Sequence, residues 1–249
     1  MTRLPGWTES TFTDDTKTYP TFRRGAGPGV IVIHEIPGIT PKVQAFAEEV
    51  VGAGFTVVMP SLTGTPGEAM GLVNVATSMG KVCVSSEFNT WATNRTSPVT
   101  TWLRALAKDL HDELGGPGVG ALGMCFSGGF ALAMMVDGHV AAPVLSQPSM
   151  PLPLTKALGA DLNLSPEDLA AVKDRVAAGC PVLGLRYASD KAVGTRFATL
   201  RRELGDGFLA VELPGRGHSV VTEHRDDDSV QRVLAFFAER LQHPVRAEA

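Results

Sequence analysis

One stretch of the chain decides the fold: Val119-Gly-Ala-Leu-Gly-Met-Cys125-Phe-Ser-Gly-Gly129. It begins as a short apolar strand, passes through a turn of small residues and continues as an apolar helix over Phe130 to Val136. Strand, sharp turn and helix in this order form a nucleophile elbow, in which the turn presents one side chain above the sheet. The residues two before and two after the tip must be small, and Gly123 and Ser127 meet that requirement. We therefore predict that Cys125, at the tip, is a nucleophile.

Composition points to one globular domain over residues 1–249, with 44% hydrophobic and 19% charged residues. The net charge is -4 without a long run of either sign, so we expect no nucleic-acid partner. No leader-like apolar segment follows Met1, and the chain lacks an apolar run long enough to span a bilayer. We expect a cytoplasmic protein, a monomer or small homo-oligomer, that does not bind membranes.

The three cysteines, Cys83, Cys125 and Cys180, form no C-x-x-C pair. An odd number without close spacing argues against a disulfide framework and against a zinc site, and it is typical of a reducing cytoplasm. We expect neither a metal nor another cofactor. The alternative for Cys125 is a structural role, because free cysteine is among the most buried residue types.

Strand and helix patterns alternate along the chain. Buried, β-branched or apolar runs predict strands at residues 30–34, 55–59, 119–124, 140–145, 181–187 and 208–213. Helical spacing or capping signals predict helices at 41–52, 98–114, 130–136, from Ser165 onward, and at 226–241. An edge hairpin is expected at 11–22, and irregular segments that line the site at about 61–97 and 148–164. This alternation predicts an α/β fold, a mostly parallel sheet with helices on both faces.

A nucleophilic cysteine needs a base, and the base needs an acid that orients it. In α/β-hydrolases these residues follow successive strands in the order nucleophile, acid, base. Asp190 follows the strand at 181–187, and His218 lies in a glycine-containing loop after the strand at 208–213. Taken singly, each has an ordinary alternative, a turn-forming aspartate or a surface histidine. Their shared order after Cys125 predicts a Cys125–His218–Asp190 triad.

The segment His34-Glu35-Ile36-Pro37-Gly38 ends the first buried strand. In α/β-hydrolases the loop at this place supplies one oxyanion-hole N–H, and the residue after the nucleophile supplies the other. We assign these donors to Ile36 and Phe126. Glu35 is an acid at the edge of an apolar site, for which the alternative is a solvated carboxylate at a strand end.

Together, four motifs resemble the dienelactone hydrolase family over about residues 28 to 240. They are His-Glu-Ile-x-Gly, the Gly-x-Cys-x-x-Gly-Gly elbow, Asp190 after the penultimate strand, and Gly-His-Ser before the last helix. The resemblance implies an α/β-hydrolase fold and a carboxymethylenebutenolidase type of enzyme, which cleaves small esters or lactones through a thioester. It also implies that Glu35 contacts the resting Cys125 thiol and takes part in forming the thiolate.

The sequence departs from this family where a substrate carboxylate is bound. The family carries an arginine four residues after the catalytic histidine, and here that position is Thr222. Arg95 is the candidate for a replacement cation, Lys81 is a weaker one, and Ser219 is a further candidate for substrate binding. We therefore expect neutral or singly charged small esters and lactones as substrates.

Two other functions are compatible with the sequence. A cysteine-elbow amidase is one, although such enzymes usually carry His-x-Glu and His218 is followed by Ser219 and Val220. A catalytically silent scaffold with a binding role is the other, because the fold alone does not exclude it.

Overall fold

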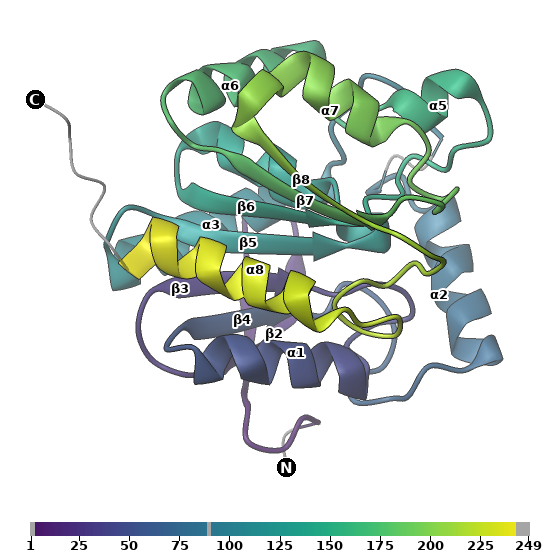
Figure 1. Cartoon of the computed structure of the whole chain (residues 1–249). Coiled ribbons are helices and arrows are strands. Elements are labelled where there is room, and N and C mark those ends of the chain that lie inside the picture. Colours follow the sequence, from purple (N-terminus) through teal and green to yellow (C-terminus); the bar gives the residue numbers. More distant parts are fainter. Residues whose placement is uncertain (1–2, 89–90, 243–249) are drawn as a thin grey trace, which may run out of the picture.

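A computed structural model describes residues 3–88 and 91–242 (Figure 1). In these residues the strands form a single eight-stranded sheet in the order β1-β2-β4-β3-β5-β6-β7-β8. The strands are β1 (Thr8–Thr13), β2 (Thr18–Arg24), β3 (Gly29–Ile33), β4 (Thr56–Pro60), β5 (Val119–Met124), β6 (Val140–Ser146), β7 (Val182–Tyr187) and β8 (Phe208–Leu213).

The sheet is antiparallel at one edge and parallel elsewhere. β1 pairs with β2, and β2 with β4, in antiparallel register, which confirms the predicted edge hairpin. All pairs from β4 through β3 and β5 to β8 are parallel. Parallel strands end at the same side of a sheet, so the segments after β3, β5, β6, β7 and β8 meet along one edge, where ligands bind in open α/β sheets.

Helices cover both faces of the sheet, as predicted (Figure 1). The helices are α1 (Pro41–Gly52), α2 (Leu72–Val84), α3 (Val99–Leu114), α4 (Phe130–Met134), α5 (Lys156–Ala160), α6 (Pro166–Ala177), α7 (Arg196–Leu204) and α8 (Asp227–Phe237). None of the helices in the described residues is both long and apolar enough to cross a membrane.

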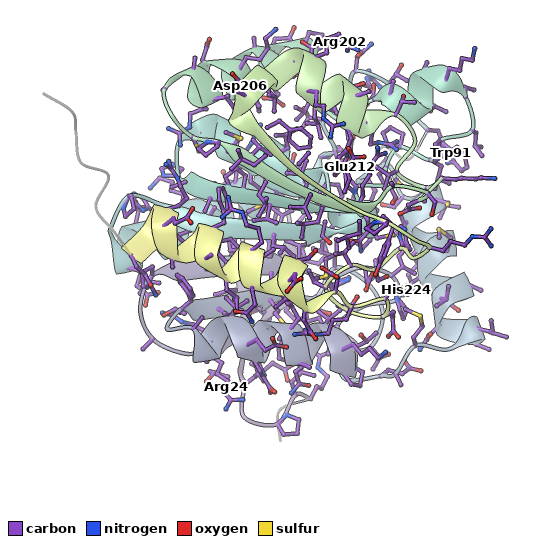
Figure 2. The ribbon with its side chains drawn as sticks, viewed as in Figure 1. Arg24, Trp91, Arg202, Asp206, Glu212 and His224 are labelled. Carbon is purple, nitrogen blue, oxygen red and sulfur yellow. The ribbon has the colours of Figure 1, made fainter. Side chains whose placement is uncertain are left out.

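Alternation along the strands divides the hydrophobic core into two layers. On β3, Ile31 and Ile33 belong to the core cluster that includes residues of α3, α4 and α7, whereas Val30 and Val32 belong to the cluster that includes residues of α1 and α8. This is the period-2 geometry of a strand, and both faces are apolar because both are covered. Side chains fill the space between the sheet and the helices (Figure 2).

The predicted start of α6 is confirmed. The Ser165 side chain accepts a hydrogen bond from the Asp168 N–H, and Pro166 occupies the first helical position. This combination satisfies an otherwise unpaired N–H and fixes the entry of the chain into the helix.

The segments predicted as irregular contain helices. α2 lies inside residues 61–97 and α5 inside residues 148–164. Within α2 only Ser78 and Val82 are buried, while Leu72 and Val73 are exposed apolar residues, so the helix has no clear apolar stripe to detect. α7 was also missed, because its buried side includes Arg196, a charged residue that interrupts the apolar pattern.

Candidate active site

Cys125 lies at the tip of a strained turn directly after β5. Its φ is +54°, in the left-handed region that side chains other than glycine rarely adopt. A Cβ on Gly123 would lie 2.1 Å from the Ser127 carbonyl oxygen, so only glycine fits at that position. Backbone strain of this kind is found preferentially at functional sites, where the surrounding structure holds it in place.

Ser127 connects this turn to the end of β3. Its hydroxyl accepts a hydrogen bond from the Met124 N–H at 2.9 Å. The same oxygen lies 3.0 Å from the carbonyl oxygens of His34 and Met124 and 3.1 Å from that of Ile33, so its single hydrogen has three acceptors within reach, two of them at the end of β3. The hydroxyl therefore fixes the elbow against the segment that begins with His34.

Asp190 and His218 are brought together from the ends of two neighbouring strands, β7 and β8. The His218 Nδ1–H donates to Asp190 Oδ2 at 2.7 Å. The other carboxylate oxygen of Asp190 accepts from the Ala192 N–H at 3.0 Å, which orients the acid. The Asp190 side chain is 6% exposed and that of His218 is 29% exposed, so the acid is enclosed and the base lies at the surface of the site.

The charge state of His218 is set by its neighbours. Burial lowers its pKa, but the hydrogen bond to Asp190 and the interaction with the Cys125 side chain raise the pKa to about 10. His218 therefore lies within interaction distance of both residues and favours the protonated imidazolium. Cys125, Asp190 and His218 thus form one contiguous cluster.

Glu35 is buried, with 2% of its surface exposed. Its carboxyl group accepts hydrogen bonds from Ser219 Oγ at 2.6 Å, from Gln147 Nε2 at 3.3 Å and from Thr222 Oγ1. Burial raises the pKa of Glu35, and the hydrogen bonds from Ser219 and Thr222 offset only part of that rise.

The structure does not show the Glu35 contact that the family resemblance implies. In the described part of the chain, the side-chain hydrogen bonds of Glu35 go to Gln147, Ser219 and Thr222 and none goes to Cys125. Thr222, which stands where the family has arginine, donates from its hydroxyl to the Glu35 carboxyl group. Glu35 therefore joins the end of β3 to the loop that carries His218.

Gln147 completes this network and was missed by sequence reasoning. It directly follows β6, has a φ of +35° and is fully buried. Its Oε1 accepts from the Val220 N–H at 3.3 Å, while its Nε2 donates to Glu35. A polar residue directly after a buried strand at the carboxyl edge of the sheet was the available signal.

The two predicted oxyanion donors, the backbone N–H groups of Ile36 and Phe126, have no backbone acceptor in the described turns and loops. Neither the Ile36 N–H nor the Phe126 N–H donates to a backbone carbonyl among the hydrogen bonds of the described turns and loops. Phe126 lies in the first turn of the short helix Cys125–Ser127, where N–H groups have no partner within the helix. Both N–H groups are therefore free to bind a ligand oxygen.

The predicted substrate-binding residues are placed differently. Arg95 is exposed, and within residues 3–88 and 91–242 no ion pair or hydrogen bond joins it to Cys125 or to His218. Lys81, on α2, is also exposed. Ser219 is buried, and its hydroxyl donates to Glu35, so it supports the site and is not directed at a substrate.

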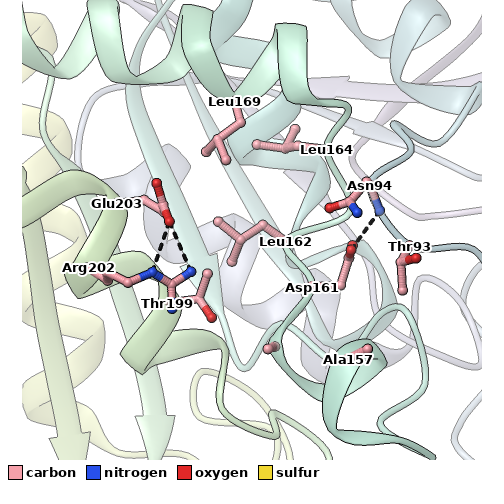
Figure 3. A pocket seen from close by; sticks show the side chains of 11 residues that line it. Thr93, Asn94, Ala157, Asp161, Leu162, Leu164, Leu169, Thr199, Arg202 and Glu203 are labelled. Carbon is pink, nitrogen blue, oxygen red and sulfur yellow. Dashed lines mark hydrogen bonds and ion pairs between the residues drawn. The ribbon is translucent and has the colours of Figure 1, made fainter.

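A separate pocket of about 330 Å³ lies between the loop at residues 93–94, α5, α6 and α7 (Figure 3). The Asn94 N–H donates to Asp161 at 2.7 Å on one side, and Arg202 pairs with Glu203 on the other. Its lining includes no residue of the Cys125 cluster. The charged side chains of the pocket each have a partner within it, and the chemistry of Cys125 lies elsewhere.

Solved structures with the same fold include several hydrolases. A putative dienelactone hydrolase from Klebsiella pneumoniae is 20% identical with a TM-score of 0.62, covering 94% of this chain and 98% of its own. A dienelactone hydrolase from Anabaena variabilis is 16% identical with a TM-score of 0.66, covering 95% and 99%. A dienelactone hydrolase-like promiscuous phosphotriesterase from metagenomic libraries is 16% identical with a TM-score of 0.62, covering 94% and 98%.

No curated protein sequence is similar enough to this chain to count as a match. The sequence profile of the dienelactone hydrolase family, in contrast, matches residues 17–241. That range holds β2 to β8, the elbow and the Asp190–His218 pair. The chain therefore belongs to the dienelactone hydrolase family and has its α/β-hydrolase fold.

Proposed function

We propose that the protein is a cysteine hydrolase that cleaves small carboxylic esters or lactones through a thioester intermediate. The observation that supports this most is the Asp190–His218 hydrogen bond of 2.7 Å beside Cys125, which lies in a strained elbow with φ +54°. A nucleophile, a base in contact with it and an acid that orients the base are the parts that acyl transfer requires.

The first half of the reaction forms the acyl-enzyme. The Cys125 thiolate attacks the substrate carbonyl carbon, and the negative charge moves to the carbonyl oxygen. The Ile36 and Phe126 N–H groups bind this oxyanion. When it collapses, the bond to the alkoxy oxygen breaks, and His218 donates its proton to the departing alkoxide. With a lactone, the resulting hydroxyl group stays attached to the acyl chain.

The second half releases the acid. His218, now neutral, removes a proton from a water molecule, which attacks the thioester carbonyl carbon. The same two N–H groups bind the second oxyanion. Its collapse breaks the carbon–sulfur bond, so that the carboxylic acid leaves and the thiolate–imidazolium pair is restored. The Asp190 charge stabilises the imidazolium in both halves.

The expected substrates carry at most one negative charge. Thr222 binds Glu35 in place of an arginine that would bind a substrate carboxylate, and Arg95 is exposed without a hydrogen bond or ion pair to Cys125 or His218 in the described residues. A clamp of two cations is therefore not formed by these residues. Neutral aryl esters and simple lactones fit the site better than dianionic lactones.

Activity profiling tests the proposal. Wild-type protein, Cys125→Ala and the matched control Cys83→Ala are each assayed against neutral and carboxylate-bearing aryl esters, lactones and thioesters. We expect turnover by wild type and Cys83→Ala and its loss in Cys125→Ala. A folded wild-type protein that hydrolyses none of these compounds would instead support the silent scaffold, and turnover of amides alone would support the amidase.

A further inference from the structure

We propose that His34 is a positioning residue that orients the Glu35–Ile36 peptide and so presents the Ile36 N–H to the substrate oxyanion. This inference rests on the proposed function. His34 is fully buried directly after β3. Its Nδ1 lies 2.8 Å from the Glu35 carbonyl oxygen, and its Nε2 lies 3.0 Å from the Leu62 nitrogen and 3.4 Å from the Thr63 nitrogen.

These contacts determine the tautomer of His34. Backbone N–H groups only donate, so Nε2 must be the acceptor of the ring for Leu62 and Thr63. The ring hydrogen of the neutral imidazole is then on Nδ1, where it donates to the Glu35 carbonyl. Burial lowers the pKa of His34 to about 4, so the ring stays neutral at the pH of an ordinary assay. The ring is held from both ends.

The direction of the Ile36 N–H follows from peptide geometry. The only cis bonds among the described residues are Ile36–Pro37 and Met150–Pro151, so the Glu35–Ile36 peptide is trans. In a trans peptide the C=O and N–H groups point in opposite directions. Because His34 binds the Glu35 carbonyl, the Ile36 N–H points away from the ring and remains unpaired.

The neighbouring contacts fix this peptide relative to the nucleophile. The Ser127 hydroxyl in the elbow lies 3.0 Å from the His34 carbonyl oxygen, so the peptide before Glu35 lies directly against the elbow. The His34 ring also packs against the ring of Phe126, with 5.7 Å between their centroids. His34 therefore contacts the carbonyl of the peptide that carries the Ile36 N–H, and it packs against Phe126, the residue with the second assigned donor.

Two substitutions separate the two ends of the ring. In His34→Asn the amide nitrogen takes the place of Nδ1 and keeps the donor to Glu35, whereas in His34→Gln the amide oxygen takes the place of Nε2 and keeps the acceptor for Leu62. We expect His34→Gln to lower kcat on an ester on the order of 100-fold, as the loss of one oxyanion donor does, with KM nearly unchanged. His34→Asn should stay within about tenfold of wild type.

Alkylation of Cys125 by iodoacetamide is the control reaction. It displaces iodide at a tetrahedral carbon and forms no oxyanion, so it needs the thiolate and His218 but not the Ile36 N–H. We expect both variants to alkylate at the wild-type rate with the wild-type pH profile. If alkylation falls together with ester turnover, His34 only supports the fold and the inference is wrong. It is also wrong if His34→Gln retains wild-type ester turnover.

A direct measurement of the Ile36 amide separates this inference from the proposed function. The chain has four isoleucines, Ile31, Ile33, Ile36 and Ile39, so selective ¹⁵N-isoleucine labelling gives a simple spectrum. The Ile36 signal should shift in His34→Gln and remain near its wild-type position in His34→Asn. This holds even for a protein without esterase turnover, and an unmoved Ile36 signal in His34→Gln contradicts the inference. Should His34→Gln fail to fold, a displaced Ile36 signal in His34→Asn contradicts it.

Discussion

Replacing Asp190 by asparagine removes the charge behind His218 and keeps the shape of the acid. The pKa of His218 rises from its ordinary value of 6.5 to about 10, against burial, through its contacts with Asp190 and Cys125. At about 1.4 kcal/mol per pH unit, this corresponds to at most about 5 kcal/mol in favour of the protonated form. Asp190 and Cys125 share this free energy, so we expect Asp190→Asn to lower the free energy of unfolding by about 2 kcal/mol.

The sign of the pH dependence follows from linkage. A histidine whose pKa is raised in the folded state adds stability that is fully present below pH 6.5 and is lost as the pH rises through about 10. The free energy of unfolding of Asp190→Asn should therefore be about 2 kcal/mol below wild type at pH 6, and the difference should shrink as the pH approaches 10. Turnover should fall by a factor on the order of 10³ or more, as when a triad acid is lost.

Urea unfolding at several pH values, followed by steady-state kinetics, checks both expectations. Asp206→Asn is the matched control, because Asp206 is exposed (Figure 2) and lies in the short helix Gly205–Gly207 directly before β8, whereas His218 follows the other end of that strand. A stability difference that stays constant from pH 6 to pH 10 would refute the reasoning. So would a folded Asp190→Asn protein with wild-type turnover.

Three further substitutions test other parts of the site. Gly123→Ala places a Cβ 2.1 Å from the Ser127 carbonyl oxygen, so it should lower both the melting temperature and turnover. A variant with the wild-type melting temperature and turnover would contradict this close contact between Gly123 and Ser127. Thr222→Val removes a hydrogen bond to the buried Glu35, which should cost about 1–3 kcal/mol of unfolding free energy, measured against Thr101→Val on exposed helix surface. Arg95→Ala should leave kcat/KM for a carboxylate-bearing ester unchanged within about twofold, since an exposed charge contributes little to binding. A large loss of kcat/KM would instead show that Arg95 binds the substrate carboxylate.

The sequence was sufficient to predict the parallel strands and the residues at their ends. The buried β-branched run of β3, the elbow after β5 and the loops after β7 and β8 each have a local signature, and a parallel sheet brings them to one edge by geometry alone. This is why the sequence could predict that Cys125, Asp190 and His218 lie at the same edge of the sheet, without knowledge of any contact.

The partners of Glu35 were not predictable in the same way. Ser219 and Thr222 lie 184 and 187 residues from Glu35 in sequence, and only the folded sheet brings them together. The same is true of His34, whose ring nitrogen binds backbone N–H groups that carry no sequence signal. α2 was not predicted for another reason, because it exposes apolar residues such as Leu72 and has almost no buried side.

The most direct test of the central claim is to trap the acyl-enzyme. The wild-type protein is mixed with an aryl ester, quenched in acid at short times and mapped by peptide mass spectrometry. We expect an acyl group on the peptide that contains Cys125, removable by neutral hydroxylamine as a thioester is, and absent from Cys125→Ala. An acyl group on Cys83, or ester turnover that persists in Cys125→Ala, would contradict it.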